Sequence, residues 1–190
     1  MTNGLAPGGW GGMVLAAGAL ALGGWAGWLD WHRRRIPNWL TVPALFLGLA
    51  LSTLLGRWPS LKSSLEGAGI ALGILLPFVL MRGLGAGDWK LMGATGAFLG
   101  PVGLIVVLLG TVLIAAAMAL VEAIRQGKGQ ATLVNLGVVL LAYSTFQVNY
   151  ARTITLDNPR LLKIPFGVAA ALSTILFFML ISIVWLFKLV

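Results

Sequence analysis

Long apolar stretches separated by short polar segments make up most of this chain from about residue 12 onward. A helix needs about 20 mainly apolar residues to cross the roughly 30 Å hydrocarbon core of a bilayer. The pattern therefore predicts an all-α, polytopic transmembrane bundle of about six spans, with a short fourth helix that ends at Gly100-Pro101. The predicted spans are 12–29, 39–55, 67–84, 88–100, 102–124 and 165–187.

The segment 130–150 is ambiguous, because its middle is apolar but Asn135, Ser144, Gln147 and Asn149 interrupt it. We interpret it as an interfacial amphipathic helix on the cytoplasmic face, before the last span. The alternative, a seventh crossing, stays open. No repeat or Pro/Ser-rich linker divides the chain, so we expect one integral-membrane domain over residues 1–190.

Glycine pairs one helical turn apart predict where transmembrane helices approach each other closely. Three such pairs occur, at positions 23/27, 69/73 and 96/100. We read them as packing positions with no chemistry of their own.

Composition narrows the class of protein. The chain is 59% hydrophobic and 9% charged, its mean hydropathy is +0.97, and it has no cysteine. A soluble domain carries about 25% charged residues, so these values exclude a soluble domain. The lack of cysteine excludes a disulfide scaffold, a thiolate metal site and a cysteine nucleophile.

The basic residues predict the orientation in the membrane. Thirteen Lys and Arg against five Asp and Glu give a formal charge of +8, which in a soluble chain would suggest nucleic acid. In a membrane chain the positions of the basic residues matter more than their sum, so we expect no nucleic-acid partner. Residues 1–12 contain no Lys or Arg, so we expect the N-terminus outside. Six spans then leave Arg57, Lys62 and Lys188 outside and ten basic residues inside, whereas a seventh span gives eight against five. The ten are Arg33, Arg34, Arg35, Arg82, Lys90, Arg125, Lys128, Arg152, Arg160 and Lys163.

Only two of the five acids are candidates for chemistry. Glu66, Glu122 and Asp157 fall at span ends or in a turn, where solvated carboxylates are common. Asp30 and Asp88 are both placed by the topology at the cytoplasmic membrane face, where an ionisable residue usually faces a partner or a wet cavity. Two carboxylates held together share one proton, so that one can deprotonate water while the other polarises a peptide carbonyl.

Structural interpretations of the same residues stay open. Asp88 could cap the fourth helix, and Asp30 could be a solvated residue paired with Arg33 or Arg34. A small transporter or channel subunit could use the two acids as an ion site. The lone His32 has no cluster of acids or cysteines around it, so we expect no metal and no cofactor.

Three segments carry a family resemblance. Residues 30–38 read Asp-Trp-His-Arg-Arg-Arg-Ile-Pro-Asn, residues 85–91 read Gly-Ala-Gly-Asp-Trp-Lys-Leu, and residues 164–167 read Ile-Pro-Phe-Gly. In this order they resemble the signatures of the type IV prepilin peptidase family, which are membrane aspartic proteases of the Gly-x-Gly-Asp type. Presenilin-like proteases share only the Gly-x-Gly-Asp element.

The resemblance implies an aspartic endopeptidase of the inner (plasma) membrane that removes the short basic leader from prepilin or pseudopilin precursors at the cytoplasmic face. It implies that Asp30 and Asp88 are catalytic. The supporting residues that we single out are Gly85, Gly87, Lys90, Pro37, Asn38 and Pro165.

Many relatives also methylate the new N-terminus, using an added region with Cys-x-x-Cys pairs. Only 29 residues precede Asp30 and none is cysteine, so we expect a short, peptidase-only form. Which precursor is cleaved, the residues of the leader pocket, the oligomeric state and whether Asp30 and Asp88 touch without substrate do not follow from the sequence.

Overall fold

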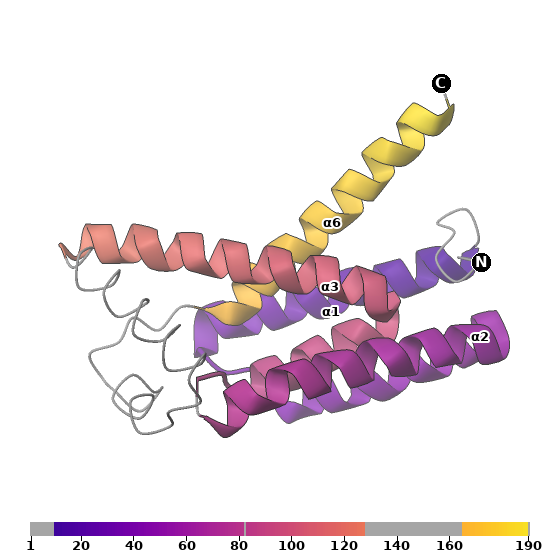
Figure 1. The fold of residues 1–190 in the computed structure, drawn as a ribbon, viewed down its shortest axis with the longest axis horizontal. Coiled ribbons are helices and arrows are strands. Elements are labelled where there is room, and N and C mark those ends of the chain that lie inside the picture. Colours follow the sequence, from indigo (N-terminus) through magenta and orange to yellow (C-terminus); the bar gives the residue numbers. More distant parts are fainter. Residues whose placement is uncertain (1–9, 82, 128–164, 190) are drawn as a thin grey trace.

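The structure is a computed structural model that describes residues 10–81, 83–127 and 165–189. Within these ranges every regular element is an α-helix, which confirms the all-α class, and the predicted interfacial helix at 130–150 lies outside them. Each helix is long and apolar enough to cross a membrane. Figure 1 shows them in chain order: α1 (Trp10–Arg33), α2 (Asn38–Leu80), α3 (Ala86–Arg125) and α6 (Phe166–Leu189).

Two of the four helices are broken by one residue. Arg57 has φ 54° and ψ −149°, and it divides α2 into a first limb (38–56) and a second limb (58–80). Gly100 has φ 69° and ψ −176°, and it divides α3 into a first limb (86–99) and a second limb (101–125). Both helices fold back on themselves at these residues (Figure 1). The α2 limbs are joined across the hairpin by a buried 2.5 Å hydrogen bond from Ser64 to Ser52.

The number of helices differs from the sequence prediction. About six separate spans were expected, and the described residues form four helices, because α2 contains the second and third predicted spans and α3 contains the fourth and fifth. The break at Gly100 is where the sequence predicted it. A residue without Cβ adopts positive φ at little cost, and Pro101 suits the first turn of the limb that follows.

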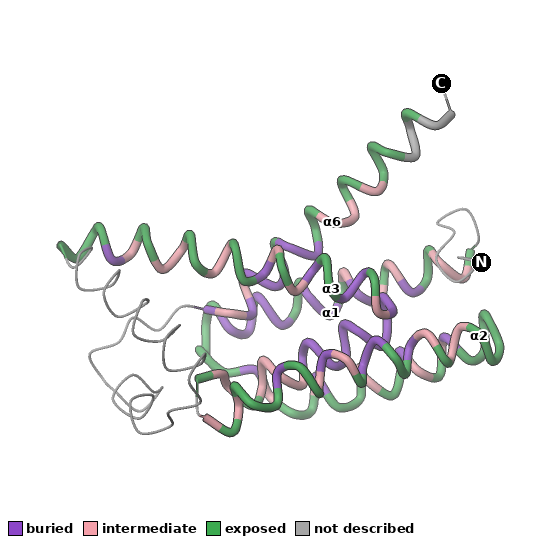
Figure 2. Tube along the Cα trace, viewed as in Figure 1, coloured by how far each residue is buried: buried purple, intermediate pink, exposed green. Residues whose placement is uncertain are grey.

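The first limb of α3 is the central element of the bundle. Residues 91–100 are all buried, as the purple segments of Figure 2 show. Small side chains permit this close packing. The backbones of Gly96 and Gly67 touch, a Cβ on Gly48 would lie 3.1 Å from that of Ala97, and Phe98 fills the space beside Gly18 of α1.

Helices α1 and α6 run antiparallel and touch near the end of α1. A Cβ on Gly27 would lie 2.8 Å from that of Ala171, and one on Gly23 would lie 3.5 Å from the Thr174 hydroxyl. Close packing at the 23/27 and 96/100 pairs is therefore confirmed. The prediction for 69/73 is wrong for the described part of the chain, because none of its atoms lies within 4 Å of where those Cβ atoms would be.

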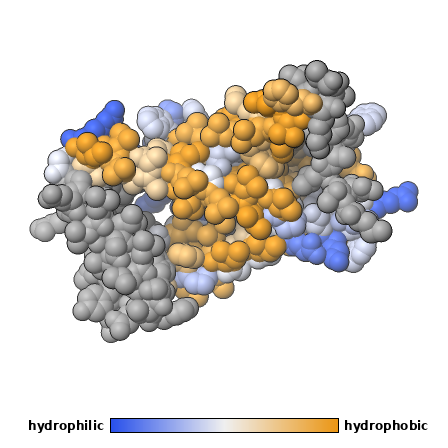
Figure 3. Space-filling view, turned by 45° about the horizontal axis from the view of Figure 1, so that its top comes forward, coloured by the Kyte–Doolittle hydropathy of each residue, from blue (hydrophilic) through white to orange (hydrophobic). Residues whose placement is uncertain are grey.

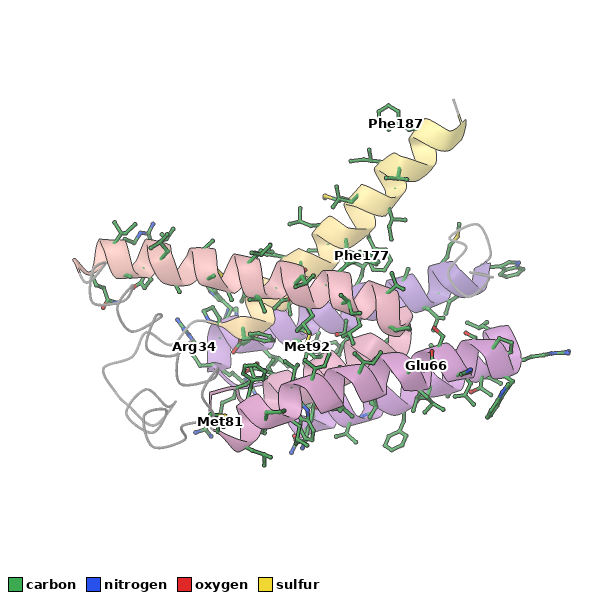
Figure 4. All side chains as sticks on the ribbon, in the orientation of Figure 1. Arg34, Glu66, Met81, Met92, Phe177 and Phe187 are labelled. Carbon is green, nitrogen blue, oxygen red and sulfur yellow. The ribbon has the colours of Figure 1, made fainter. Side chains whose placement is uncertain are left out.

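The surface has the distribution expected of a membrane protein. Figure 3 shows a broad band of hydrophobic side chains across the described part, with hydrophilic groups toward its ends. Figure 4 places Arg34 near Met81 at one end of the bundle, and Glu66 of α2 toward the opposite end of the bundle. Large hydrophobic residues are exposed on every described helix, such as Met13, Leu54, Leu113 and Leu180. Exposed apolar side chains are unfavourable in water and favourable against lipid chains, so this surface suits the interior of a bilayer.

Candidate active site

Asp30 lies in the last turn of α1 and is only 6% exposed. Its Oδ2 accepts a 2.7 Å hydrogen bond from the backbone N–H of Gly167, and the N–H of Val168 also bonds the carboxylate. These donors belong to the first turn of α6, where N–H groups have no partner within the helix. Asp30 is therefore not the solvated interfacial residue that one interpretation of the sequence suggested.

The end of α1 adds a cation to this environment. Arg34 has left-handed backbone (φ 51°), as the residue that closes a helix commonly does. Its N–H donates a 2.9 Å hydrogen bond to the Asp30 carbonyl. Its side chain interacts electrostatically with the Asp30 carboxylate. An electrostatic interaction with Arg34, one of the two partners that the sequence allowed, is thus present, but the acid is buried.

Asp88 lies in the first turn of α3 and is half-buried. Its carboxylate accepts a hydrogen bond from the backbone N–H of Gly85, the residue that caps the helix. A Cβ on Gly85 would lie 2.7 Å from Asp88 Oδ2, so the carboxylate folds back over a position that only glycine leaves free. The capping role that the sequence allowed for Asp88 is present.

The fold brings the two acids together. Asp30 and Asp88 are close enough for their carboxylates to interact electrostatically, although 58 positions separate them in the chain. The last turn of α1 and the first turn of α3 meet at the end of the bundle where Figure 4 shows Arg34 and Met81. Among the described residues no group of three or more His, Cys, Asp or Glu could hold a metal ion.

Ile36 connects the three segments that carry these acids and their hydrogen-bond donors. It is 9% exposed. A Cβ on Gly87 would lie 2.8 Å from its carbonyl oxygen, and a Cβ on Gly167 would lie 3.0 Å from its Cδ1. Gly87 therefore permits close contact between the start of α3 and the segment that follows α1. Sequence reasoning did not single out Ile36, and the available signal was one apolar residue between an arginine run and a proline.

Two of the predicted supporting residues bond each other. Lys90 Nζ in α3 donates a 3.0 Å hydrogen bond to Asn38 Oδ1 in α2. This bond joins the first two sequence motifs on the exposed side of the site. It was not predicted, because nothing in the sequence shows which residues face each other across helices.

The two supporting prolines precede helices. Pro37 caps α2 with extended backbone (φ −77°, ψ 147°), directly before the first helical residue, Asn38. Pro165 is buried directly before α6, and its carbonyl accepts the Ala169 N–H at 3.3 Å. A residue without an N–H suits a helix start, where that donor would have no partner.

Two further residues position the site and were missed. Gly167 supplies the donor to Asp30; it lay in a quoted motif, and glycine there signalled a close approach. Trp89 Nε1 donates at 2.8 Å to the Leu72 carbonyl, which ties the first turn of α3 to the second limb of α2. An indole beside an acid gives no such indication in sequence.

An apolar bundle of helices with two interacting aspartates at one end defines a class: a helical membrane protein with a paired-carboxylate site. Residues 13–120, more than half of the chain and including both acids, match the type IV leader peptidase family. The chain belongs to this family, which confirms the sequence-based resemblance.

One curated relative is the prepilin leader peptidase/N-methyltransferase of Xanthomonas campestris pv. campestris. It is 27% identical over 139 residues, which are 70% of this chain and 47% of the relative. The chain thus spans about half the length of the relative that it matches. No solved structure matches the chain.

Proposed function

We propose that this protein is a membrane-embedded aspartic endopeptidase that removes the short basic leader from type IV pilin-like precursors. The observation that carries the proposal is the pairing of buried Asp30 with Asp88 at one end of the bundle, inside the range that matches the leader peptidase family. The name of the Xanthomonas relative, a prepilin leader peptidase/N-methyltransferase, supports a prepilin as the substrate.

The chemistry follows from two carboxylates that share one proton. The charged carboxylate takes a proton from a water molecule as that water attacks the carbonyl carbon of the scissile peptide bond. The protonated carboxylate donates a hydrogen bond to the carbonyl oxygen, and a proton passes to the leaving nitrogen as the C–N bond breaks. Asp30 and Asp88 are suited to these roles because backbone N–H groups orient both side chains.

The limbs of the broken helices complete the proposed topology. We propose that each limb of α2 and α3 crosses the membrane separately, which gives six crossings with α1 and α6. The N-terminus then lies outside, and Asp30 and Asp88 lie at the cytoplasmic face of the inner membrane. The ten-to-three division of Lys and Arg supports this orientation.

The proposal concerns the peptidase activity alone. The name of the relative also includes N-methyltransferase, and the matched residues cover 47% of the length of that relative. That this chain lacks the methyltransferase activity stays a prediction, based on its lack of cysteine.

Co-expression with an epitope-tagged prepilin tests the function. The parent should convert the precursor to the shorter mature form, and Asp30→Asn and Asp88→Asn should each leave it uncleaved while still inserting into the membrane. Glu66→Gln is the matched control, because Glu66 is an exposed acid paired with Lys62 at the other end of the bundle. Cleavage that survives either Asp change, or that is lost in the control, contradicts the proposal.

A further inference from the structure

Thr41 in the first turn of α2 has a buried hydroxyl without a hydrogen-bond partner among the described residues. The residue is 0% exposed, and Oγ1 is the one buried side-chain polar atom of the described chain that lacks a partner. Leaving a buried hydroxyl unpaired costs stability, so buried polar groups are nearly always bonded. An exception of this kind requires a reason.

The usual local solution is not used at this position. The other described threonines each donate to the carbonyl four residues earlier, at 2.7–2.9 Å. For Thr41 that carbonyl belongs to Pro37, and it accepts the backbone N–H groups of Leu40 at 3.1 Å and of Thr41 itself at 3.4 Å. The four that follow the rule are Thr53, Thr95, Thr111 and Thr174.

The neighbouring contacts place Thr41 beside the candidate active site. Positions 41, 45 and 48 share one face of the first limb of α2. At the start of this limb Asn38 bonds Lys90, two residues after Asp88. Further along the limb Gly48 packs on Ala97. Thr41 lies between these two contacts along the limb, one turn further into the bundle than Asn38.

The turn that holds Thr41 is weakly fixed. Pro37 provides no side-chain cap for α2, and the backbone bond of Thr41 is long at 3.4 Å. The Lys90–Asn38 bond that ties this turn to α3 is exposed, and exposed contacts of this kind contribute little. A small outward shift of the turn would therefore expose the hydroxyl to a chain entering beside Asp88.

We propose that the Thr41 hydroxyl binds a backbone amide group of the substrate peptide as that peptide enters beside Asp88. This inference rests on the proposed peptidase function and adds a substrate-binding residue to it. A hydroxyl can donate to a peptide carbonyl or accept from a peptide N–H, so it recognises extended backbone irrespective of side chains. Its lack of a partner in the free protein is then the cost of having a binding group ready.

Three variants test this assignment with purified protein and a synthetic precursor peptide. Thr41→Val removes the hydroxyl at nearly constant shape, and we expect KM to rise and kcat/KM to fall about 2- to 10-fold, the value of one hydrogen bond. Thr41→Ser keeps the hydroxyl and should stay within about 2-fold of the parent. Thr95→Val is the control, since Thr95 is also buried but its hydroxyl bonds the Leu91 carbonyl within its own helix.

The melting temperature without substrate separates this role from a structural one. Because Thr41→Val removes an unpaired buried hydroxyl, its melting temperature should equal or exceed that of the parent. A lower melting temperature would mean that the hydroxyl already has a partner, such as a resident water, and would overturn the assignment. Unchanged kcat/KM would overturn it too. If Asp88→Asn still cleaves the peptide, it is the peptidase function itself that fails.

Discussion

The carboxylate of Asp30 accepts a 2.7 Å hydrogen bond from the backbone N–H of Gly167, 137 positions later in the chain. The bond is buried and joins the last turn of α1 to the first turn of α6. It gives the third sequence motif a physical role, because that motif starts the helix whose free N–H groups orient the acid. Asp88 has a comparable but more local arrangement with Gly85.

Gly167→Ala should disturb Asp30 directly. The added Cβ would lie 2.9 Å from Asp30 Cβ and 3.1 Å from Oδ2, so the acid must move. Since small displacements of a catalytic group are costly, we expect cleavage of a prepilin to fall about 10-fold or more while the protein still inserts. The initial rate of precursor conversion measures this.

Gly73→Ala is the matched control for that change. No described residue lies within 4 Å of its added Cβ, and alanine favours a helix by about 1 kcal/mol over glycine. Cleavage should stay at the parent rate. If both alanine variants lose activity equally, the contact of Gly167 with Asp30 is not the cause.

The two Asp→Asn variants should differ in stability although both lose activity. Asp30 bonds two backbone N–H groups and interacts with Arg34, whereas Asp88 bonds one. An amide can replace only part of the first set, so Asp30→Asn should be destabilised by about 1–3 kcal/mol. The melting temperature of Asp88→Asn should match or exceed that of the parent, since this change removes one of two neighbouring carboxylates. Melting temperatures in detergent test this order, and the reverse order would contradict the described geometry.

A double-mutant cycle tests the bond between Lys90 and Asn38. If Lys90 acts by holding Asn38 at 3.0 Å, then Lys90→Met, Asn38→Leu and the double variant should each reduce cleavage by a similar, small factor of about 2–5. If Lys90 instead acts on the charge of Asp88 independently of Asn38, the two effects will multiply. Relative kcat/KM values distinguish these results.

The sequence was sufficient for the all-α class of fold, and it singled out the two acids that the structure brings together. Six apolar runs, the break at Gly100 and the motifs around Asp30 and Asp88 were all evident from spacing, since hydrophobic length and glycine-proline breaks are local properties. The exact point of the reversal in α2, at Arg57, was not evident, because a single non-glycine residue with positive φ has no sequence signal of its own.

The contacts that assemble the site were beyond sequence reasoning. Ile36 beside Gly87, and Gly167 beside Asp30, depend on how separate helices approach each other. The glycine pair 69/73 shows the same limit, because its spacing equals that of 23/27 but it faces outward. Spacing identifies which residues share a helix face, and only the packed structure shows which faces meet.

Single cysteines test the proposed crossings, and the natural chain has none to interfere. In intact cells, Arg57→Cys at the α2 reversal should react with a membrane-impermeant maleimide from outside. Arg35→Cys, beyond the end of α1, should react only after the membrane is opened. Labelling after denaturation controls for the presence of each thiol. Labelling of Arg57→Cys only from the cytoplasmic side would contradict the six-crossing topology.

The most direct test of the two-aspartate site uses purified protein in lipid nanodiscs and a synthetic peptide that spans a basic leader and the first apolar residues of a pilin. Mass spectrometry of the products should show the leader and the shortened peptide with the parent protein. Asp30→Asn and Asp88→Asn should each reduce their formation by at least about 100-fold, the usual value of general acid–base catalysis. Product formation at the parent rate by either variant would contradict the account.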